Sequence, residues 1–213
     1  SKDFSIEALR SETFAELERL MVATVTHPSQ DGVGIAGPQV GLNRRVVAVQ
    51  RFDKGIAGAD GEMEYPFEVY PNIRIIWASD SLSAGPEGCL SVPGRRGDVL
   101  RSQEIIVEYA DMTSIRDTSC EDIPMIQDTV RGFTAVIFQH EIDHLSGVLY
   151  IDHLPEFLTY AEETNFRKTP KFGQTMEFFR RLEESSPVVH CPSFGTSPMG
   201  RDLALVIVDK DGL

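Results

Sequence analysis

The sequence predicts an α+β fold. Residues 6–25 and 132–146 have the periodicity of helices, and several short runs rich in Val and Ile have the composition of strands. The strands are grouped on both sides of the helices, without the regular alternation of βαβ units. At 213 residues, the chain is long enough for one sizeable domain or for a domain with an appendage.

The first element is expected to be one amphipathic helix. Within residues 6–25, Phe14, Met21 and Val25 recur at helical spacing. The glycines and prolines of the following stretch, residues 27–43, exclude a continued helix there.

The central part of the chain is expected to be mainly strands. The runs with strand composition are RVVAVQRF (45–52), YPFEVYPNIRIIWAS (65–79, divided at Pro71), QEIIVEYAD (103–111) and IPMIQDTVRG (123–132). Polar residues, or glycines and prolines, dominate the stretches between them, so that loops and turns are expected at 53–64, 85–101 and 113–122.

A second helix is predicted at 132–146, where Phe133, Val136, Ile137 and Leu145 share a broad apolar face and a glycine follows at a C-terminal capping position. Beyond it the pattern weakens, and the expected elements are a short helix at 175–186, a loop at 191–200 and a strand at 203–209. We therefore expect one domain over 1–154 and a C-terminal extension, 155–213, of unassigned role that packs on the same domain.

Composition narrows the classes of function. The formal net charge is −13, which disfavours sequence-independent binding to the phosphate backbone of nucleic acids. No apolar run approaches the roughly 18 residues of a membrane span. The first residues lack an apolar signal core and an initiator Met, and three widely spaced cysteines indicate a reducing compartment.

The stretch QHEIDHLSG (139–147) carries the clearest chemical signal. His140 and His144 lie four residues apart, so they project from one face of a helix and can bind one metal ion. Glu141 lies about 100° around the helix axis, where it can reach a water molecule at the metal without being a ligand. This arrangement suits hydrolysis, with the glutamate transferring protons.

Three positions are candidates for the third ligand. The extended zincin pattern would need a histidine where this chain has Tyr150. Glu162 or Glu163 would serve in a zinc peptidase, although both lie in a charged, exposed stretch. Cys89, in the glycine-bounded stretch PEGCLSVPG, is the remaining candidate, because a thiolate with two histidines leaves an open, catalytic position.

Three segments in order resemble the peptide deformylase family: GVGIAGPQVG (32–41), EGCLS (87–91) and QHEIDHLSG (139–147). The first departs from the family pattern at Gly37, where a second alanine is usual, and the other two match in full. The resemblance spans roughly residues 6–154. It implies antiparallel sheets packed around a central metal-binding helix.

The resemblance also implies roles for individual residues. Cys89, His140 and His144 would bind the metal ion, and Glu141 would be the general base and then the acid. Gln39 and the backbone N–H of Leu90 would stabilise the oxyanion. An Arg101–Asp143 ion pair would brace the metal-binding helix. Substrate-binding positions are expected at Gly34, Ile35, Gly88, Arg96, Phe133, Val136 and Ile137.

The implied reaction removes the N-formyl group from formyl-methionine at the start of newly made polypeptides and releases formate. The implied cofactor is one divalent ion, natively Fe(II), with Zn(II), Ni(II) or Co(II) as possible occupants. Formylated nascent peptides at the ribosome are the expected partners of a cytoplasmic, or mature organellar, monomer. Two alternatives remain open: the zinc peptidase, and an inactive relative that binds peptides or ribosomes.

Overall fold

The computed structural model describes residues 1–30, 32–58, 61–116, 121–154, 158–164, 167–186, 188–200 and 202–208. The chain divides into two compact units, Ser1–Tyr150 and Ile151–Leu213. The expected packing of the C-terminal extension on the first domain stays a prediction. Within the described residues, none of the helices has both the length and the apolar character needed to cross a bilayer.

Among its described residues, the N-terminal unit has four α-helices, two 3-10 helices and ten strands. Its helices are α1 (Ile6–Arg10), α2 (Glu12–Val25), α3 (Met112–Ile115) and α4 (Gly132–Leu145), with 3-10 helices η1 (Gly37–Val40) and η2 (Phe52–Lys54). Its strands are β1 (Gly34–Ala36), β2 (Val46–Gln50), β3 (Ile56–Ala57), β4 (Met63–Glu64), β5 (Phe67–Pro71), β6 (Arg74–Ala78), β7 (Leu82–Cys89), β8 (Val92–Ser102), β9 (Glu104–Ala110) and β10 (Met125–Arg131).

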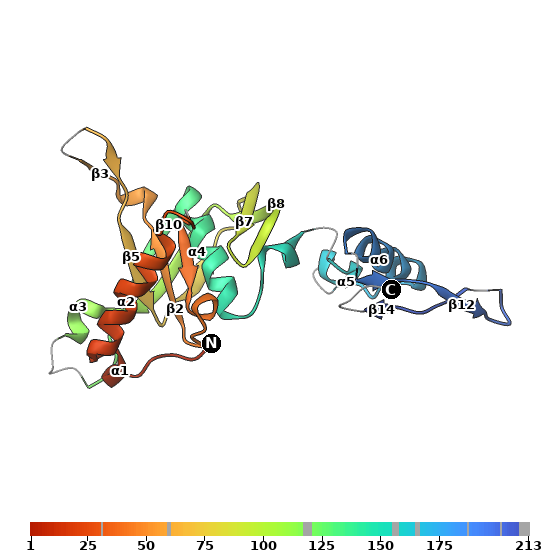
Figure 1. The fold of residues 1–213 in the computed structure, drawn as a ribbon, viewed down its shortest axis with the longest axis horizontal. Helices are drawn as coiled ribbons and strands as arrows, with labels where there is room; N and C mark the ends of the chain where they lie inside the picture. The colour runs from red at the N-terminus through yellow and green to blue at the C-terminus, as the bar shows by residue number, and fades with distance from the viewer. Residues whose placement is uncertain are drawn as a thin grey trace. The chain divides into compact units, whose positions relative to one another are not determined.

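All strand pairs of the sheets are antiparallel, in the orders β1-β2-β5, β10-β9-β6, β7-β8 and β3-β4. Helix α4 packs against β1, β2, β6, β8, β9 and β10. Figure 1 shows α4 near the labelled strands β2 and β10. The predicted α+β fold, with antiparallel sheets around a central helix, is confirmed.

Helices cover both faces of the β1-β2-β5 sheet. Val47 and Val49 of β2 face the core cluster that contains α4, whereas Val46 and Ala48 face α2. Side chains alternate along a strand, so a strand covered on both faces is apolar at every position. This explains the uninterrupted apolar run that identified β2 in the sequence.

Four predicted elements of the N-terminal unit are corrected by the structure. The single helix expected at 6–25 is two helices, because Ser11 is extended and its hydroxyl accepts a hydrogen bond from the N–H of Phe14, which starts α2. The segment expected as a loop at 85–101 belongs to the long β7–β8 hairpin. The expected loop at 53–64 also contains η2 and the small β3–β4 hairpin, and that at 113–122 overlaps α3, while its residues 117–120 lie outside the described residues.

The C-terminal unit contains the 3-10 helix η3 (Tyr150–His153), which begins at the last residue of the N-terminal unit, and the helices α5 (Tyr160–Glu163) and α6 (Phe172–Ser185). Its strands are β11 (Val189–His190), β12 (Ser193–Thr196), β13 (Asp202–Ala204) and β14 (Ile207–Val208), paired β11-β14 and β12-β13. The helix predicted at 175–186 corresponds to α6. The strand predicted at 203–209 is divided into β13 and β14, and its residue 209 lies outside the described residues. The loop predicted at 191–200 contains β12.

Candidate active site

The side chains of Cys89, His140 and His144 converge, with their ligand atoms all within 4.8 Å of one another. Sγ of Cys89 lies 3.3 Å from Nε2 of His144. The two imidazole rings come from successive turns of α4, with centroids 5.0 Å apart and planes at 82°. A thiolate with two imidazoles is a donor set suited to zinc, iron and related divalent ions, so the side chains fit a metal ion.

The orientation of His140 is set by carboxylate and aromatic neighbours. Its Nδ1 lies 2.8 Å from Oε2 of Glu87, where the imidazole donates because a carboxylate can only accept. Tyr150 stacks on the same ring, with centroids 6.0 Å apart. With Nδ1 engaged, Nε2 of His140 is the nitrogen left for a metal ion.

Glu87 is in turn held by Arg101. Nε and Nη2 of Arg101 bind the two carboxylate oxygens of Glu87 at 2.8 and 3.0 Å, and both side chains are buried. Nη1 of Arg101 reaches Asp143 on α4 at 2.6 Å. The structure therefore contains the expected Arg101–Asp143 ion pair, and it joins the β7–β8 hairpin to the helix that carries both histidines.

The surroundings of Cys89 and His140 shift the pKa of both groups. Burial would raise the pKa of Cys89, but hydrogen bonds with His140 and His144 outweigh it and lower this pKa to about 5. Burial would lower the pKa of His140, whereas its bonds to Cys89 and Glu87 raise it to about 10. Cys89 is thus a thiolate at neutral pH, the form that binds metals, and a bound ion would displace the His140 proton.

Glu141 lies on α4 with its carboxylate enclosed. Its side chain is 4% exposed, and Oε2 is buried without a hydrogen-bond partner among the described residues. Burial raises the pKa of Glu141 to about 7, against the opposing influence of His140 and His144. A carboxyl group with this pKa can both accept and return a proton near neutral pH.

Gln39, on η1, is fixed at both ends of its amide. Oε1 accepts a hydrogen bond from the N–H of Ala36 at 2.8 Å, and Nε2 donates to Oγ of Ser91 at 3.1 Å. The same Nε2 lies 3.6 Å from Sγ of Cys89, which places an N–H donor beside the metal-ligand cluster. Leu90, the second predicted donor, follows Cys89 directly in the turn between β7 and β8.

A cavity of about 590 Å³ opens onto this cluster. Its lining includes Gln39, Cys89, Leu90, His140 and Glu141. The predicted substrate-binding residues that also line it are Gly34, Gly88, Arg96, Phe133, Val136 and Ile137.

Ile35 is an exception, and its expected place in the cavity wall is corrected. It does not line the cavity but is buried in the core with Met21 and Val25 of α2. Its neighbour Ala36 faces the α4 side of the sheet, because side chains alternate along β1.

The alternative third ligands, Glu162 and Glu163, both have partners within the C-terminal unit. Glu162 is engaged in a capping box, its Oε2 accepting from the N–H of Thr159 at 2.9 Å, and Glu163 pairs with Arg181 at 3.3 Å. Within the described part of the chain, the only cluster suited to a metal ion is Cys89, His140 and His144.

A family model described as polypeptide deformylase matches residues 2–158. The chain belongs to this family. It is an enzyme that removes the N-formyl group from nascent peptides, and neither the zinc peptidase nor the inactive relative is favoured.

Individual relatives agree with the family assignment. The peptide deformylase of Leptospira biflexa is 35% identical over 154 residues, covering 72% of this chain and 79% of the relative. Peptide deformylase 2 of a Nostoc species is 36% identical over 163 residues, covering 76% and 84%.

Solved deformylase structures share the fold. The class I type b peptide deformylase of Acinetobacter baumannii, with Met-Ala-Ser bound, has a TM-score of 0.59 and 31% identity, covering 72% of this chain and 89% of that chain. The Thermotoga maritima enzyme has a TM-score of 0.56 and 28% identity, with coverages of 72% and 87%.

The sequence reasoning missed two contributors to the deformylase site. Glu87 accepts a hydrogen bond from Nδ1 of His140 and so orients its ring. This role could have been predicted from the EGCLS segment, because a metal-bound imidazole needs an acceptor for its other nitrogen. Val33 lines the cavity between two motif glycines, and its hydrophobicity alone gave no means of distinguishing it from a core residue.

Proposed function

We propose that Cys89, His140 and His144 bind one catalytic divalent ion, and that Glu141 is the general base and acid of deformylation. The observation that carries this proposal is the convergence of the three ligand atoms within 4.8 Å beside a buried carboxylate oxygen that has no partner among the described residues. A buried polar atom without a partner destabilises the fold unless a water molecule or the substrate donates a hydrogen bond to it.

The reaction breaks the C–N bond of a formamide and adds one water molecule, giving formate and a free amine. A bound divalent ion would act as a Lewis acid and lower the pKa of water. Glu141 accepts a proton from the attacking water and returns it to the departing nitrogen, which its pKa of about 7 allows. Because Glu141 is enclosed, the exchange takes place away from bulk solvent.

We assign the stabilisation of the oxyanion to Gln39 and to the backbone N–H of Leu90. The amide of Gln39 is oriented before substrate binds, since Ala36 fixes its oxygen and so directs Nε2 toward Cys89. Such preorganised donors are most effective where negative charge develops during the reaction.

The first side chain of the substrate is assigned to the cavity walls formed by Phe133, Val136 and Ile137. Gly34 and Gly88 border the same space and let the peptide backbone approach, and β1 is an edge strand to which a peptide can pair. Arg96 is exposed and also lines the cavity, and we assign it to the rim of the substrate site. The Met-Ala-Ser peptide bound to the Acinetobacter baumannii relative supports a peptide in this cavity.

We further propose Fe(II) as the native ion, because the family resemblance implies it, while Zn(II), Ni(II) and Co(II) suit the same donors. Because its substrates are newly made peptides, we propose that the enzyme acts near ribosomes. Its location would then be the cytoplasm or, for a mature organellar form, an organelle. The net charge of −13 opposes self-association and supports a monomer.

The test is formate release from a formyl-Met-Ala-Ser peptide by protein loaded with Fe(II) without oxygen, or with Ni(II). Cys89→Ala is measured alongside, and Cys191→Ala is the matched control because Cys191 is also half-buried but lies in the C-terminal unit. We expect formate from the wild type and from Cys191→Ala, and neither bound metal nor formate with Cys89→Ala. Metal binding and turnover in Cys89→Ala would overturn the proposed ligand set.

A further inference from the structure

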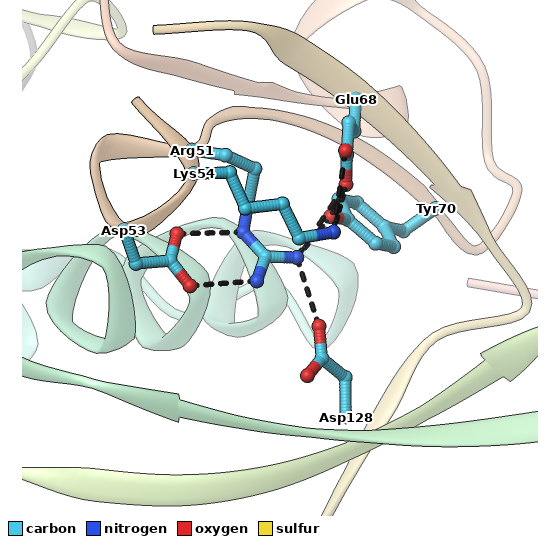
Figure 2. A network of polar contacts seen from close by, with 6 residues as sticks. All are labelled: Arg51, Asp53, Lys54, Glu68, Tyr70 and Asp128. Carbon is cyan, nitrogen blue, oxygen red and sulfur yellow. Dashed lines mark hydrogen bonds and ion pairs between the residues drawn. The ribbon is translucent and has the colours of Figure 1, made fainter. Parts of the chain in front are cut away.

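A buried arginine beside helix α4 is paired with acidic and aromatic side chains. Arg51 is 1% exposed, and its Nε and Nη2 donate to the carboxylate of Asp53 at 2.8 and 2.7 Å. Its Nη1 donates to Asp128 of β10 at 2.9 Å and also to the hydroxyl of Tyr70 of β5, as Figure 2 shows. Because the donors of a guanidinium form a rigid planar fork, these partners together determine its position.

The guanidinium and its partners contact α4 at two positions. Arg51 lies over the ring of Phe138, 5.6 Å from its centroid, and Tyr70 packs edge-on against the same ring at 4.9 Å. One helical turn earlier, the pKa of Asp53, which is lowered mainly by its hydrogen bond to Arg51, is lowered further by a hydrogen bond from Thr134. Both Phe138 and Thr134 are buried. The network of Figure 2 therefore holds α4 by these two side chains.

These two contacts are on the face of α4 that carries Glu141. Thr134, Phe138 and Glu141 have the spacing i, i+4 and i+7, so they fall within about 60° around the helix axis. Contacts that hold the first two side chains therefore also determine the rotation at which Glu141 leaves the helix.

Arg51 is also tied to the strand against which Glu141 packs. Strand β2 ends at Gln50, directly before Arg51, and its Val49 is the register partner of Gly34 in β1. Gly34 is packed against Glu141, with no room for a side chain. Arg51 thus joins the pair of strands that contains Gly34 to the helix face that contains Glu141.

We propose that Arg51 is a positioning residue for deformylation, which keeps α4 in the rotation that presents Glu141 to the reacting water. This rests on the proposed function, because Arg51 acts through Glu141 as the general base. A misplacement of about 1 Å caused by a mutation far from the reacting atoms can slow a reaction about 100-fold. A lysine at this position would keep the charge but would lose the paired donors to Asp53 and the planar group over Phe138.

The experiment measures kcat, KM and bound metal for Arg51→Lys, both alone and combined with Glu141→Gln. We expect Arg51→Lys alone to lower kcat by about 10-fold, part of the roughly 100-fold or more that a general base contributes, with KM and metal content unchanged. Combined with Glu141→Gln, it should cause no further fall, because the group that it positions is no longer a base. A purely structural role would lower turnover by the same factor in both backgrounds.

Phe138→Leu is the second variant, and it decides the question if Arg51→Lys does not fold. It removes the ring between Arg51 and the helix while leaving the ion pairs of Arg51 intact, and its effect should also disappear with Glu141→Gln. Arg45→Lys is the matched control, since Arg45 adjoins the other end of β2 and binds Asp3 and the carbonyl oxygen of Ile73. We expect wild-type turnover in this control.

Wild-type kcat in the folded variant, or an equal loss in both backgrounds, overturns the positioning role while leaving the deformylase assignment intact. A rise in KM without a fall in kcat overturns it as well, because that result indicates a lost substrate contact. Wild-type turnover by Glu141→Gln itself removes the proposed role of Glu141 and this inference with it.

Discussion

Glu141 and Gly34 are packed so closely that position 34 has no room for a side chain. A Cβ on Gly34 would lie 2.5 Å from Oε1 of Glu141 and 2.8 Å from its Cγ. The glutamate is enclosed by the protein and cannot move aside into solvent. Gly34 therefore leaves the space that the carboxylate of Glu141 occupies. This contact explains why the first motif has a glycine at position 34.

Gly34→Ala should displace Glu141 and lower kcat. We expect a fall of about 100-fold, the lower end of what a general base contributes. Metal content should remain at one ion per chain, because the three atoms nearest to the added Cβ all belong to Glu141, which is not a proposed ligand. Steady-state kinetics and metal analysis measure the two effects.

The matched control is Gly85→Ala. Gly85 lies on β7, and a Cβ there meets nothing within 4 Å. Wild-type turnover in Gly34→Ala would show that the position of Glu141 does not limit the reaction.

Replacing Glu141 with Gln removes proton transfer but keeps the volume of the side chain. We expect kcat to fall by about 100- to 10,000-fold, with metal still bound. Glu162→Gln is the control, because Glu162 would be a metal ligand in the zinc peptidase alternative. We expect this variant to keep full deformylase activity. Substantial turnover by Glu141→Gln would contradict its role as general base.

The spacing of the two histidines was sufficient to predict two of the three proposed metal ligands. A four-residue interval on a helix determines which face both side chains share, so local geometry suffices. The third ligand was different, because Cys89 is 51 or more positions away from either histidine in a separate hairpin. Only the pairing of elements in space brings its Sγ to His144, and no local periodicity encodes that contact.

The β7–β8 hairpin shows why parts of the fold were missed. Gly85, Pro86 and Gly88 interrupt any alternating pattern in β7, and glycine and proline are ordinarily depleted in strands. The strand forms because β8 pairs with it from Leu82 to Cys89. The division of the first helix at Ser11 was missed for the opposite reason: the apolar spacing continues across the break, and only the capping hydroxyl ends the periodic segment.

Gly37 is where this chain departs from the first family motif, and restoring alanine should reduce activity. A Cβ at position 37 would lie 2.6 Å from the carbonyl oxygen of Arg44 and 2.9 Å from that of Leu42. These are backbone atoms, so η1 itself must shift, and Gln39 with it. We expect kcat to fall by about 10-fold and stability by about 1–3 kcal/mol, as in other overpacked sites.

Kinetics and urea denaturation of Gly37→Ala measure both effects. Gly85→Ala again provides the control for adding a methyl group. An increase in turnover would show that the loop accommodates alanine and that Gly37 impairs the wild-type enzyme.

The Arg51–Asp53 pair should make stability depend on pH in the acid range. Its hydrogen bond to Arg51 is the main reason that the pKa of Asp53 lies below its ordinary value. A carboxyl group whose pKa is lowered in the folded state stabilises the protein at pH values above its unfolded-state pKa, near 3.9. This stabilisation is lost as the pH falls through the folded-state pKa. The stability difference between wild type and Asp53→Asn should thus be constant from pH 5 to 7 and shrink below about pH 4. Urea denaturation at each pH measures it, with the exposed Asp98→Asn as control, and a difference that stays constant down to pH 3 would contradict the pairing.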